Sequence, residues 1–599
     1  MSLNRSTRLT VFLAAALLIP AANGLAAPAA GPKPVSVFPS PGTPVASNTT
    51  TFSFRGLKPG NLGPVRVVGS SSGRHGGRRL VHSDGNGVSF VPRRAFSPGE
   101  TVSVFTRKAI KLARGGDFRV RIGRSLGRGG IQPVSRVPNR FPRLHSKPGL
   151  RPPSLDVLTS TEESVPGQIL FAPKQTGLTI ADRSGRITWF RPTVFDGGSE
   201  VQDFNVQTYR GKRVLTYWKA RSQAGNDQKG SFNILNRNYT RIARFGMGNG
   251  YRPDAHEFVI SPRSTALALA YRVVRRDLRK FGGPRNGRVL DNVVQEIDIR
   301  TGAVLFEWHS IGKVGLEASI SRPDGRTPWD YFHVNSVEDD GDSFLVSARK
   351  VNTVYRISKR TGRIRWRLRG DGVESRNDFE MGPGTSFGYQ HDARRLPNGD
   401  ISLFDNGVAK SFPNIQDESS ALVLRLRGDS AETRRAGLVK RFVHRPSPVM
   451  SGSQGSAQVL AGGGAFVGWG SMPRLTEFTP DGDIAFDATF EQAPVNSYRA
   501  RKVVWNGVPN GRPALASRRK GEGMTVWASW NGAGNIDHWR VLAGPGAKRL
   551  KLVRTAPWRG LETAIPVSQR RAVIRVQAIS ASGKVLGQSA VAPLGKRAG

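Results

Sequence analysis

The sequence predicts an all-β protein in which a six-bladed β-propeller is flanked by N-terminal and C-terminal β-sandwich domains of the immunoglobulin or fibronectin type. Seventy glycines and 39 prolines separate many short apolar runs, which favours strands over helices. Two kinds of segment recur between about 156 and 490, as expected of a repeat architecture. At 599 residues the chain is too long for one ordinary core.

The first 27 residues are typical of a secretory signal peptide. Arg5 and Arg8 precede an apolar run from Leu9 to Pro20, and small residues follow. That run is too short to span a bilayer comfortably, so we expect a cleaved signal and a secreted, extracytoplasmic protein. The chain contains no cysteine, which excludes disulfides, thiolate metal sites and a cysteine nucleophile.

Two segments outside the repeats alternate apolar and polar residues between Gly and Pro turns. Residues 34–124 and 495–597 each have about the length of a small β-sandwich. Residues 125–155 are rich in Pro, Gly and Arg and have little apolar periodicity, which predicts a linker.

The chain is strongly basic, with a net charge of +46 from 90 Lys and Arg against 44 Asp and Glu. The arginines are spread along the sequence and lack the interleaved aromatic residues of a base-stacking surface, so no specific nucleic-acid partner is expected. Weak association with an anionic cell envelope is the simpler prediction. The positive field would also favour a small anionic substrate.

Each repeat unit begins with a distinctive residue, followed eight positions later by Gly or Ser and then by an apolar strand. The six pairs are Thr159 with Gly167, Asp203 with Gly211, His256 with Ser264, His333 with Gly341, His391 with Gly399, and Gln454 with Gly462. A turn followed by a strand with bulky residues ends each unit, as in RSGRITWF and RTGRIRWRL, and this segment also occurs six times. The counts predict six blades over residues 156–490.

This arrangement predicts a site at one mouth of the propeller channel. The first strand of each blade lines the channel, so His256, His333 and His391 should converge from three successive blades. Asn335 faces the same side as His333 in an extended segment, and Arg349 follows the next strand. Imidazoles beside a guanidinium suit an anion during group transfer, and a neutral imidazole can act as a nucleophile.

Two other classes of function compete with this interpretation. Three histidines are also a zinc ligand set, although an arginine aimed at the same place would repel the cation. A propeller can instead bind a ligand or a partner at its mouth without catalysis. Asp405 and Asn406, which follow the strand after His391, are interpreted as turn residues rather than channel contacts.

Several segments resemble the bacterial arylsulfotransferase family, in particular its second branch. They are AHEFVI, VVQEIDIRTGAVLFEWHSI, PWDYFHVNSVEDDGDSFLVSARKVNTVYRISKRTGRIRWRLRG, FGYQHDARRLPNGDISLFDNG and GWGSMPRLTEFTPDGDI, all within about 155–490. The resemblance implies a six-bladed propeller in which an aryl sulfate donates its sulfuryl group to a histidine and a phenolic acceptor then takes it. It implies no cofactor, no metal and no adenylylated sulfate donor.

The resemblance also implies a role for each candidate residue. His391, in the QHDA motif, would be the transiently sulfated nucleophile. His333, Asn335 and Arg349 would bind the sulfuryl oxygens, and His256 would be an oxyanion ligand or proton-transfer partner. Acceptor choice is expected to depend on loops at the channel mouth, such as 282–287 and 412–419.

Overall fold

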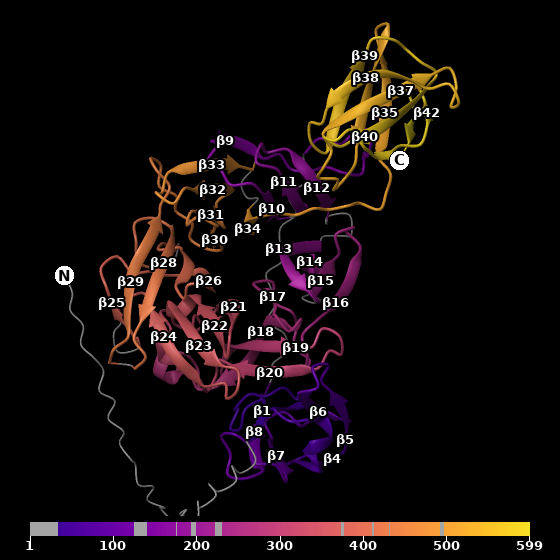
Figure 1. Ribbon diagram of the computed structural model, residues 1–599. Coiled ribbons are helices and arrows are strands. Elements are labelled where there is room, and N and C mark those ends of the chain that lie inside the picture. Colours follow the sequence, from indigo (N-terminus) through magenta and orange to yellow (C-terminus); the bar gives the residue numbers. More distant parts are fainter. Residues whose placement is uncertain are drawn as a thin grey trace, which may run out of the picture.

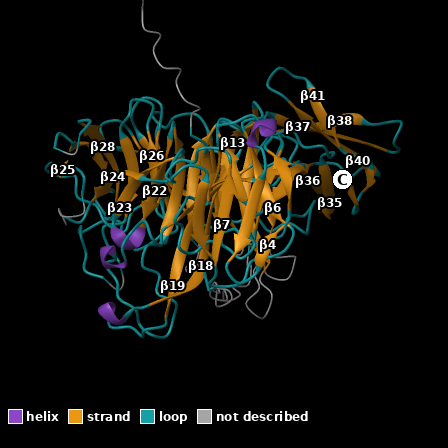
Figure 2. Ribbon diagram, turned by 90° about the horizontal axis from the view of Figure 1, so that it is seen from below, coloured by secondary structure: helices purple, strands orange, loops and turns teal. Residues whose placement is uncertain are grey.

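The computed structural model describes residues 34–124, 141–174, 176–192, 199–221, 230–372, 377–409, 412–430, 432–490 and 496–598. It confirms an all-β protein: Figure 2 shows strands throughout the molecule and only short helical turns. Within the described ranges these turns are η1 (Pro59–Leu62), η3 (Arg279–Phe281), η4 (Leu316–Ala318) and η5 (Arg349–Val351). No helix of the described residues is long and apolar enough to cross a membrane. The predicted signal peptide, 1–27, lies outside the described residues.

Two four-stranded sheets form the N-terminal unit, in the orders β1-β2-β6-β5 and β4-β3-β7-β8. Their strands are β1 (Ser36–Phe38), β2 (Phe52–Arg55), β3 (Val65–Gly69), β4 (Gly73–His75), β5 (Gly77–Val81), β6 (Gly87–Pro92), β7 (Thr101–Thr106) and β8 (Asp117–Arg121). The two sheets enclose one apolar cluster that includes Phe52, Phe54 and Val104. The unit packs on the outer strand of the third ring sheet, where the ring centroids of Phe38 and Phe306 are 4.6 Å apart.

Six sheets follow one another in a ring (Figure 1). The first is β34-β10-β11-β12, the second β13 to β16, the third β17 to β20, the fourth β21 to β24, the fifth β26-β27-β28-β29-β25, and the sixth β30-β31-β32-β33-β9, each written from the inside outward.

The strands of the first three sheets are β34 (Ser497–Val503), β10 (Gln168–Pro173), β11 (Gly177–Ala181), β12 (Ile187–Pro192), β13 (Ser199–Tyr209), β14 (Lys212–Arg221), β15 (Ser231–Leu235), β16 (Arg241–Phe245), β17 (Phe258–Ile260), β18 (Ala266–Arg276), β19 (Gly287–Ile297) and β20 (Val304–His309). Those of the last three are β21 (Val334–Asp340), β22 (Ser343–Ala348), β23 (Thr353–Ser358), β24 (Ile364–Arg369), β25 (Glu380–Met381), β26 (His391–Arg395), β27 (Ile401–Asp405), β28 (Ser420–Arg427), β29 (Arg435–Phe442), β30 (Ser456–Val459), β31 (Ala465–Gly468), β32 (Arg474–Phe478), β33 (Ile484–Thr489) and β9 (Asp156–Ser160).

The segments that enter and leave the ring, β9 and β34, pair with strands from the opposite end of the ring segment. β34 pairs antiparallel with β10 as the innermost strand of the first sheet, and β9 pairs antiparallel with β33 as the outermost strand of the sixth. Two sequence-based boundaries are therefore wrong. Thr159 does not begin an inner strand, and residues 497–503 belong to the ring rather than to the C-terminal sandwich.

Side chains on or next to the inner strands tie together five of the six pairs of neighbouring sheets. In every case a carboxylate or hydroxyl oxygen accepts the backbone N–H of the following inner strand. The pairs are Asp203 with Phe258 (2.8 Å), Glu257 with Val337 (3.3 Å), Ser336 with Ala393 (3.2 Å), Asp392 with Ala457 (3.1 Å), and Ser456 with Ala500 (3.1 Å). Inner strands that have no ladder partner on the axial side thereby satisfy these buried N–H groups.

The inner strands are also bulged where they begin. The pairing register shifts between Val334 and Ser336 in β21 and between His391 and Arg394 in β26. His333 and Asp392 have positive φ angles of 55° and 57°, which non-glycine residues adopt rarely. Such bulges change where side chains point, and here they lie next to the predicted site.

The C-terminal unit is a second pair of sheets, in the orders β39-β36-β35-β43 and β38-β37-β40-β41 with β42 beside β40. Its strands are β35 (Ala514–Lys520), β36 (Gly523–Ser529), β37 (His538–Gly544), β38 (Lys551–Pro557), β39 (Glu562–Val567), β40 (Val573–Ile579), β41 (Val585–Gln588), β42 (Ala592–Pro593) and β43 (Arg597–Ala598). An apolar cluster around Trp539 fills the space between them. Asn531 joins this unit to the ring through two hydrogen bonds with the backbone of Phe190, of 2.9 and 2.8 Å.

Candidate functional site

The three predicted histidines lie at the starts of the inner strands of three consecutive sheets. His256 precedes β17, His333 precedes β21, and His391 is the first residue of β26. The rings of His256 and His333 meet edge to face with 5.1 Å between their centroids. Tyr498 on β34 joins the group, because its ring centroid lies 5.4 Å from that of His256 and 6.3 Å from that of His391. Ring closure thus brings these side chains together at one end of the inner strands.

His391 is buried, at 2% exposure, and both of its ring nitrogens have a partner. Nδ1 lies 2.6 Å from Oδ1 of Asn406, and Nε2 accepts a long 3.3 Å hydrogen bond from the backbone N–H of Gln454. Burial lowers the pKa of His391 well below its usual value, and the positive charge of Arg349 lowers it further. His391 is therefore a neutral imidazole at physiological pH.

The other two histidines have carboxylate partners. Nδ1 of His256 lies 2.5 Å from Oδ1 of Asp254, and Nδ1 of His333 is hydrogen bonded to Asp330. Their side chains keep 22% and 23% of their surface exposed, so they lie on the open side of His391. Burial lowers the pKa of His333, and the Asp330 carboxylate opposes that shift. In each ring the carboxylate engages Nδ1, so Nε2 is the nitrogen left for a ligand.

Arg349 begins η5, directly after β22. Its Nη2 donates to the carbonyl of Gly452 at 2.9 Å, and its guanidinium lies 5.4 Å from the ring centroid of Tyr389. Its Nε is buried and has no hydrogen-bond partner among the described residues. A fixed guanidinium with an unused donor beside a neutral imidazole suits an oxyanion.

Asn335 is more deeply buried than the sequence suggests for an oxyanion ligand. Its side chain is fully buried, and its Nδ2 donates to the carbonyl of Gln390, the residue before His391, at 2.7 Å. One N–H of the amide is thus committed to holding the start of β26. Asn335 Oδ1 has no hydrogen-bond partner among the described residues.

A layer of buried charges lies directly beneath the histidines on the ring axis. Arg499 of β34 donates to Asp203 at 2.8 Å and to Glu257 at 2.5 Å, and its Nη2 donates to the carbonyl of Asn335 at 2.9 Å. Asp392 accepts from both guanidinium nitrogens of Arg501, at 2.6 and 2.7 Å. His391 therefore contacts the site residues while Asp392, its neighbour in the bulge, contacts this layer.

Four residues of the site were not identified from the sequence. Asn406 is a contact of His391 and not only a turn residue, so that interpretation is wrong. Asp254 and Asp330 lie two and three residues before their histidines, and this spacing was a usable signal. Tyr498 lies outside the predicted repeats, on a strand that joins the ring only at closure.

The described residues contain no group of three or more His, Cys, Asp or Glu side chains arranged to hold a metal ion. Carboxylates or an amide occupy the Nδ1 atoms of the three histidines, and Arg349 adds positive charge beside them. The positive charge of Arg349 beside the rings favours an anion over a cation there.

Comparison with solved structures gives low sequence identities and low TM-scores. Solved structures with partial likeness include hydrazine synthase of Kuenenia stuttgartiensis, at 13% identity over 59% of this chain and 81% of that chain, with a TM-score of 0.30. A catalytically inactive virginiamycin B lyase from Staphylococcus aureus is 9% identical over 63% of this chain and 96% of its own, with a TM-score of 0.28. An auxiliary nutrient binding protein from Bacteroides ovatus is 11% identical over 76% and 98%, with a TM-score of 0.29.

No curated protein matches the chain. Residues 205–491, however, match the family model described as arylsulfotransferase (ASST), and this range contains all five predicted site residues. Over residues 205–491, just under half of the chain, the protein matches the arylsulfotransferase family, and this match indicates an arylsulfotransferase enzyme.

Proposed function

We propose that the protein moves a sulfuryl group from an aryl sulfate to a phenolic acceptor through a sulfated His391. The observation that carries this proposal is the neutral, buried imidazole of His391 beside the guanidinium of Arg349 and the rings of His256 and His333. Family membership supports aryl sulfate donors and phenol acceptors in general.

In the first half-reaction, the lone pair of His391 Nε2 attacks sulfur, the bond from sulfur to the aryl oxygen breaks, and the aryl oxide leaves with the electron pair. His256 and His333, each paired with a carboxylate, bind the sulfuryl oxygens or protonate the departing oxide. Arg349 stabilises the negative charge of the sulfuryl oxygens. Sulfuryl transfer, like phosphoryl transfer, depends mainly on such charge stabilisation and on positioning. In the second half-reaction, a phenol gives its proton to His256 or His333, its oxygen attacks sulfur, and the bond from sulfur to nitrogen breaks with its electron pair returning to Nε2 of His391.

The assignment of His391 is tested with 4-nitrophenyl sulfate and phenol. We expect His391→Ala to lower the release of 4-nitrophenol by at least about 10³-fold, because no other ring can replace a buried nucleophile. His538→Ala is the matched control, since that histidine lies in β37 of the C-terminal unit, outside the ring. Full turnover by the His391 variant would contradict the assignment.

The finer architecture and location are also proposed. The six sheets would be the blades of a six-bladed propeller, and the two flanking units would be sandwiches of the immunoglobulin or fibronectin type. The N-terminal residues 1–27 would direct secretion, which mass measurement of the exported protein tests. Residues 34–124 carry 15 Lys and Arg against three Asp and Glu, and residues 505–598 carry 16 against three, which supports weak adhesion of both units to an anionic envelope.

A further inference from the structure

The amide of Asn406 has only one possible orientation. Its Nδ2 lies 2.6 Å from the carbonyl oxygen of Ser451 and 3.1 Å from that of Gln454, and both oxygens can only accept. The amide oxygen must therefore face His391. Because Oδ1 also can only accept, the proton of the neutral His391 ring is on Nδ1, and the lone pair is on Nε2.

The three histidines of the site thus differ in the group that faces Nδ1. Asp254 and Asp330 are carboxylates that can accept a proton from His256 and His333, whereas Asn406 cannot accept one from His391. We propose that Asn406 is a positioning residue that makes Nε2 of His391 the attacking atom and keeps the Nδ1 proton on the ring throughout the reaction.

This inference rests on the proposed function, because its second part concerns the sulfated ring. When Nε2 forms a bond to sulfur and Nδ1 keeps its proton, the ring becomes an imidazolium that carries a sulfonate group. A positively charged ring leaves more readily than a neutral one when a phenol oxygen attacks sulfur. An aspartate at this position would take the proton, the ring would lose its positive charge, and the resulting N-sulfoimidazole would be more persistent.

Asn406→Asp and Asn406→Ala separate the two parts. With 4-nitrophenyl sulfate alone, Asn406→Asp should still give a burst of 4-nitrophenol close to one per site. Transfer from the sulfated enzyme to phenol should then slow by about 10²-fold. Asn406→Ala should slow the burst itself by about tenfold or more, because the ring then loses its short Nδ1 hydrogen bond and keeps only the long one from Gln454. Asn233→Asp is the control, since Asn233 is a buried amide of β15 that donates to the carbonyl of Ser231 at 3.1 Å.

A purely structural role would lower thermal stability and slow both half-reactions alike, which would overturn the inference. Wild-type transfer rates in both variants would overturn it too. The proton position is measured independently of activity, from the nitrogen resonances of [15N]histidine-labelled protein at pH 7. The His391 signal is assigned as the one that disappears in His391→Ala. In the wild type it should show a protonated Nδ1. A protonated Nε2 would refute the inference even if sulfuryl transfer is confirmed.

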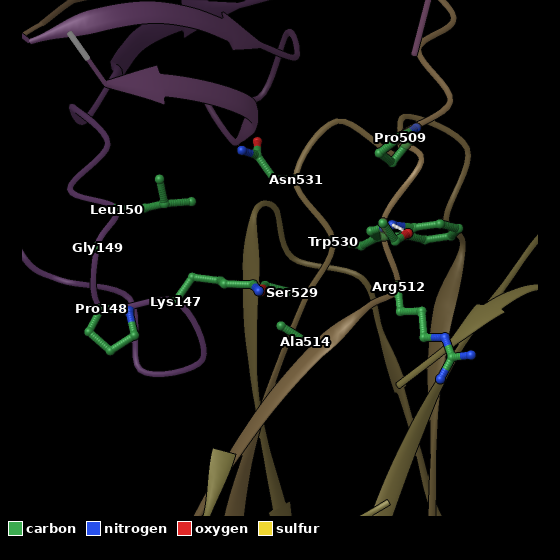
Figure 3. A pocket seen from close by; sticks show the side chains of 11 residues that line it. Lys147, Pro148, Gly149, Leu150, Pro509, Arg512, Ala514, Ser529, Trp530 and Asn531 are labelled. Carbon is green, nitrogen blue, oxygen red and sulfur yellow. Dashed lines mark hydrogen bonds between the residues drawn. The ribbon is translucent and has the colours of Figure 1, made fainter. Parts of the chain in front are cut away.

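An independent observation concerns a pocket of about 590 Å³ outside the ring centre. It is formed by the segment before β9, the loop before β35 and the end of β36, and Figure 3 shows Lys147 and Leu150 on one side and Trp530 and Arg512 on the other. Its lining residues are Lys147, Pro148, Gly149, Leu150, Pro509, Gly511, Arg512, Ala514, Ser529, Trp530 and Asn531. None of these eleven is acidic. The volume is in the usual range for a small-molecule site.

Several contacts hold the walls of this pocket in place. Ser146 Oγ and Ser529 Oγ are 2.7 Å apart, and Glu562 accepts the backbone N–H groups of His145 and Ser146 at 3.0 and 2.7 Å. The ring of His145 stacks on Trp527 with 4.0 Å between centroids. Trp530 Nε1 donates to the carbonyl of Gly511 at 2.7 Å, which sets the indole plane. A preformed site loses little entropy on binding.

The geometry points to an aromatic anion as the ligand of this pocket, with the chemistry of an aryl sulfate. Trp530, Pro148 and Leu150 offer flat apolar contacts for a ring, and Lys147 and Arg512 supply positive charge for a sulfate. Such a site would hold donor or product away from the histidines.

Equilibrium dialysis of 4-nitrophenyl sulfate against His391→Ala tests this proposal without turnover. We expect two bound molecules per chain, and one after Arg512→Glu is added. Lys548→Glu, an exposed charge reversal outside the lining, should leave two. Binding that does not respond to Arg512→Glu would overturn the pocket assignment. If the protein binds one molecule and this binding is lost with Arg512→Glu, the pocket is occupied but the site at the histidines is not. That result would count against the proposed function.

Discussion

Arg499 Nη1 lies 2.5 Å from Glu257 Oε1, and both side chains are buried on the axis of the ring. The same guanidinium reaches the carbonyl of Asn335, so this ion pair supports the strand that follows His333. Arg499 comes from the last strand of the ring and Glu257 from the third sheet. The layer of charge beneath the histidines therefore forms only when the ring is closed. The arrangement of the histidines above it depends on ring closure in the same way.

Arg499→Met should strongly destabilise the protein. The substitution leaves Asp203 without an ion-pair partner among the described residues and leaves Glu257 with Arg394 alone. Breaking a buried pair from one side costs about 3–5 kcal/mol. We expect a matching fall in the free energy of unfolding in urea. Arg279→Ala is the control, because that arginine belongs to an exposed pair with Asp277 and should leave the unfolding curve unchanged. Equal stability of the Arg499 variant and the wild type would show that the layer does not hold the ring.

Ser336→Ala tests the bonds between neighbouring inner strands. Ser336 Oγ accepts the N–H of Ala393 at 3.2 Å, and the alanine would leave this buried donor without a partner. The expected loss is about 1–3 kcal/mol in the free energy of unfolding. Ser402→Ala is a matched control, since the buried hydroxyl of Ser402 has no hydrogen-bond partner among the described atoms. If both variants lose the same stability, packing rather than this hydrogen bond explains the effect.

Glu338→Gln should change how stability depends on pH. Burial raises the pKa of Glu338 to about 7, above the value of an unfolded chain. In the folded protein this carboxyl stays protonated below that pH, so its contribution to stability is complete below about pH 4 and is lost as pH rises through 7. The glutamine variant should match the wild type near pH 4 and exceed it by about 2–4 kcal/mol at pH 8. Thermal unfolding at both pH values measures this, and an equal difference at both would contradict the shift.

Much of the site could be predicted from the sequence, because the eight-residue spacing from His256, His333 and His391 to the next turn marks equivalent positions in the ring. That spacing correctly placed three histidines at the starts of neighbouring inner strands. The partners of these histidines were less visible. In the sequence, Asp254 and Asp330 look like ordinary loop residues, and only the fold brings their carboxylates to the Nδ1 atoms of His256 and His333.

Closure of the ring could not be read from local patterns. Residues 497–503 read as one more alternating strand of the C-terminal unit, and only their pairing with β10 puts Tyr498 and Arg499 at the axis. Residues 156–160 fit the repeat frame but pair with β33, as a fifth strand outside the four that the last sheet already has. Pairing across more than 300 residues leaves no signal in either segment alone.

Arg349→Met and Arg349→Lys should separate charge from geometry at the site. Either change removes the planar fork that donates to Gly452 and should lower kcat/KM by about 10²–10³-fold. Only methionine removes the positive charge that lowers the pKa of His391, so only that variant should move the acidic limb of the pH profile to higher pH. Identical limbs in the two variants would show that Arg349 does not act on His391 through its charge.

The wild-type burst should itself be insensitive to mild acid. His391 must be unprotonated to attack sulfur, and burial lowers its pKa well below 6.5. The reactive form therefore persists as pH falls through 6, and the rate declines only when pH passes below the lowered pKa. Stopped-flow release of 4-nitrophenol, followed near its isosbestic wavelength from pH 8 to 4.5, measures the limb directly. A midpoint near 6.5 would mean that an ordinary, solvated histidine controls the step, which is incompatible with His391 as the structure holds it.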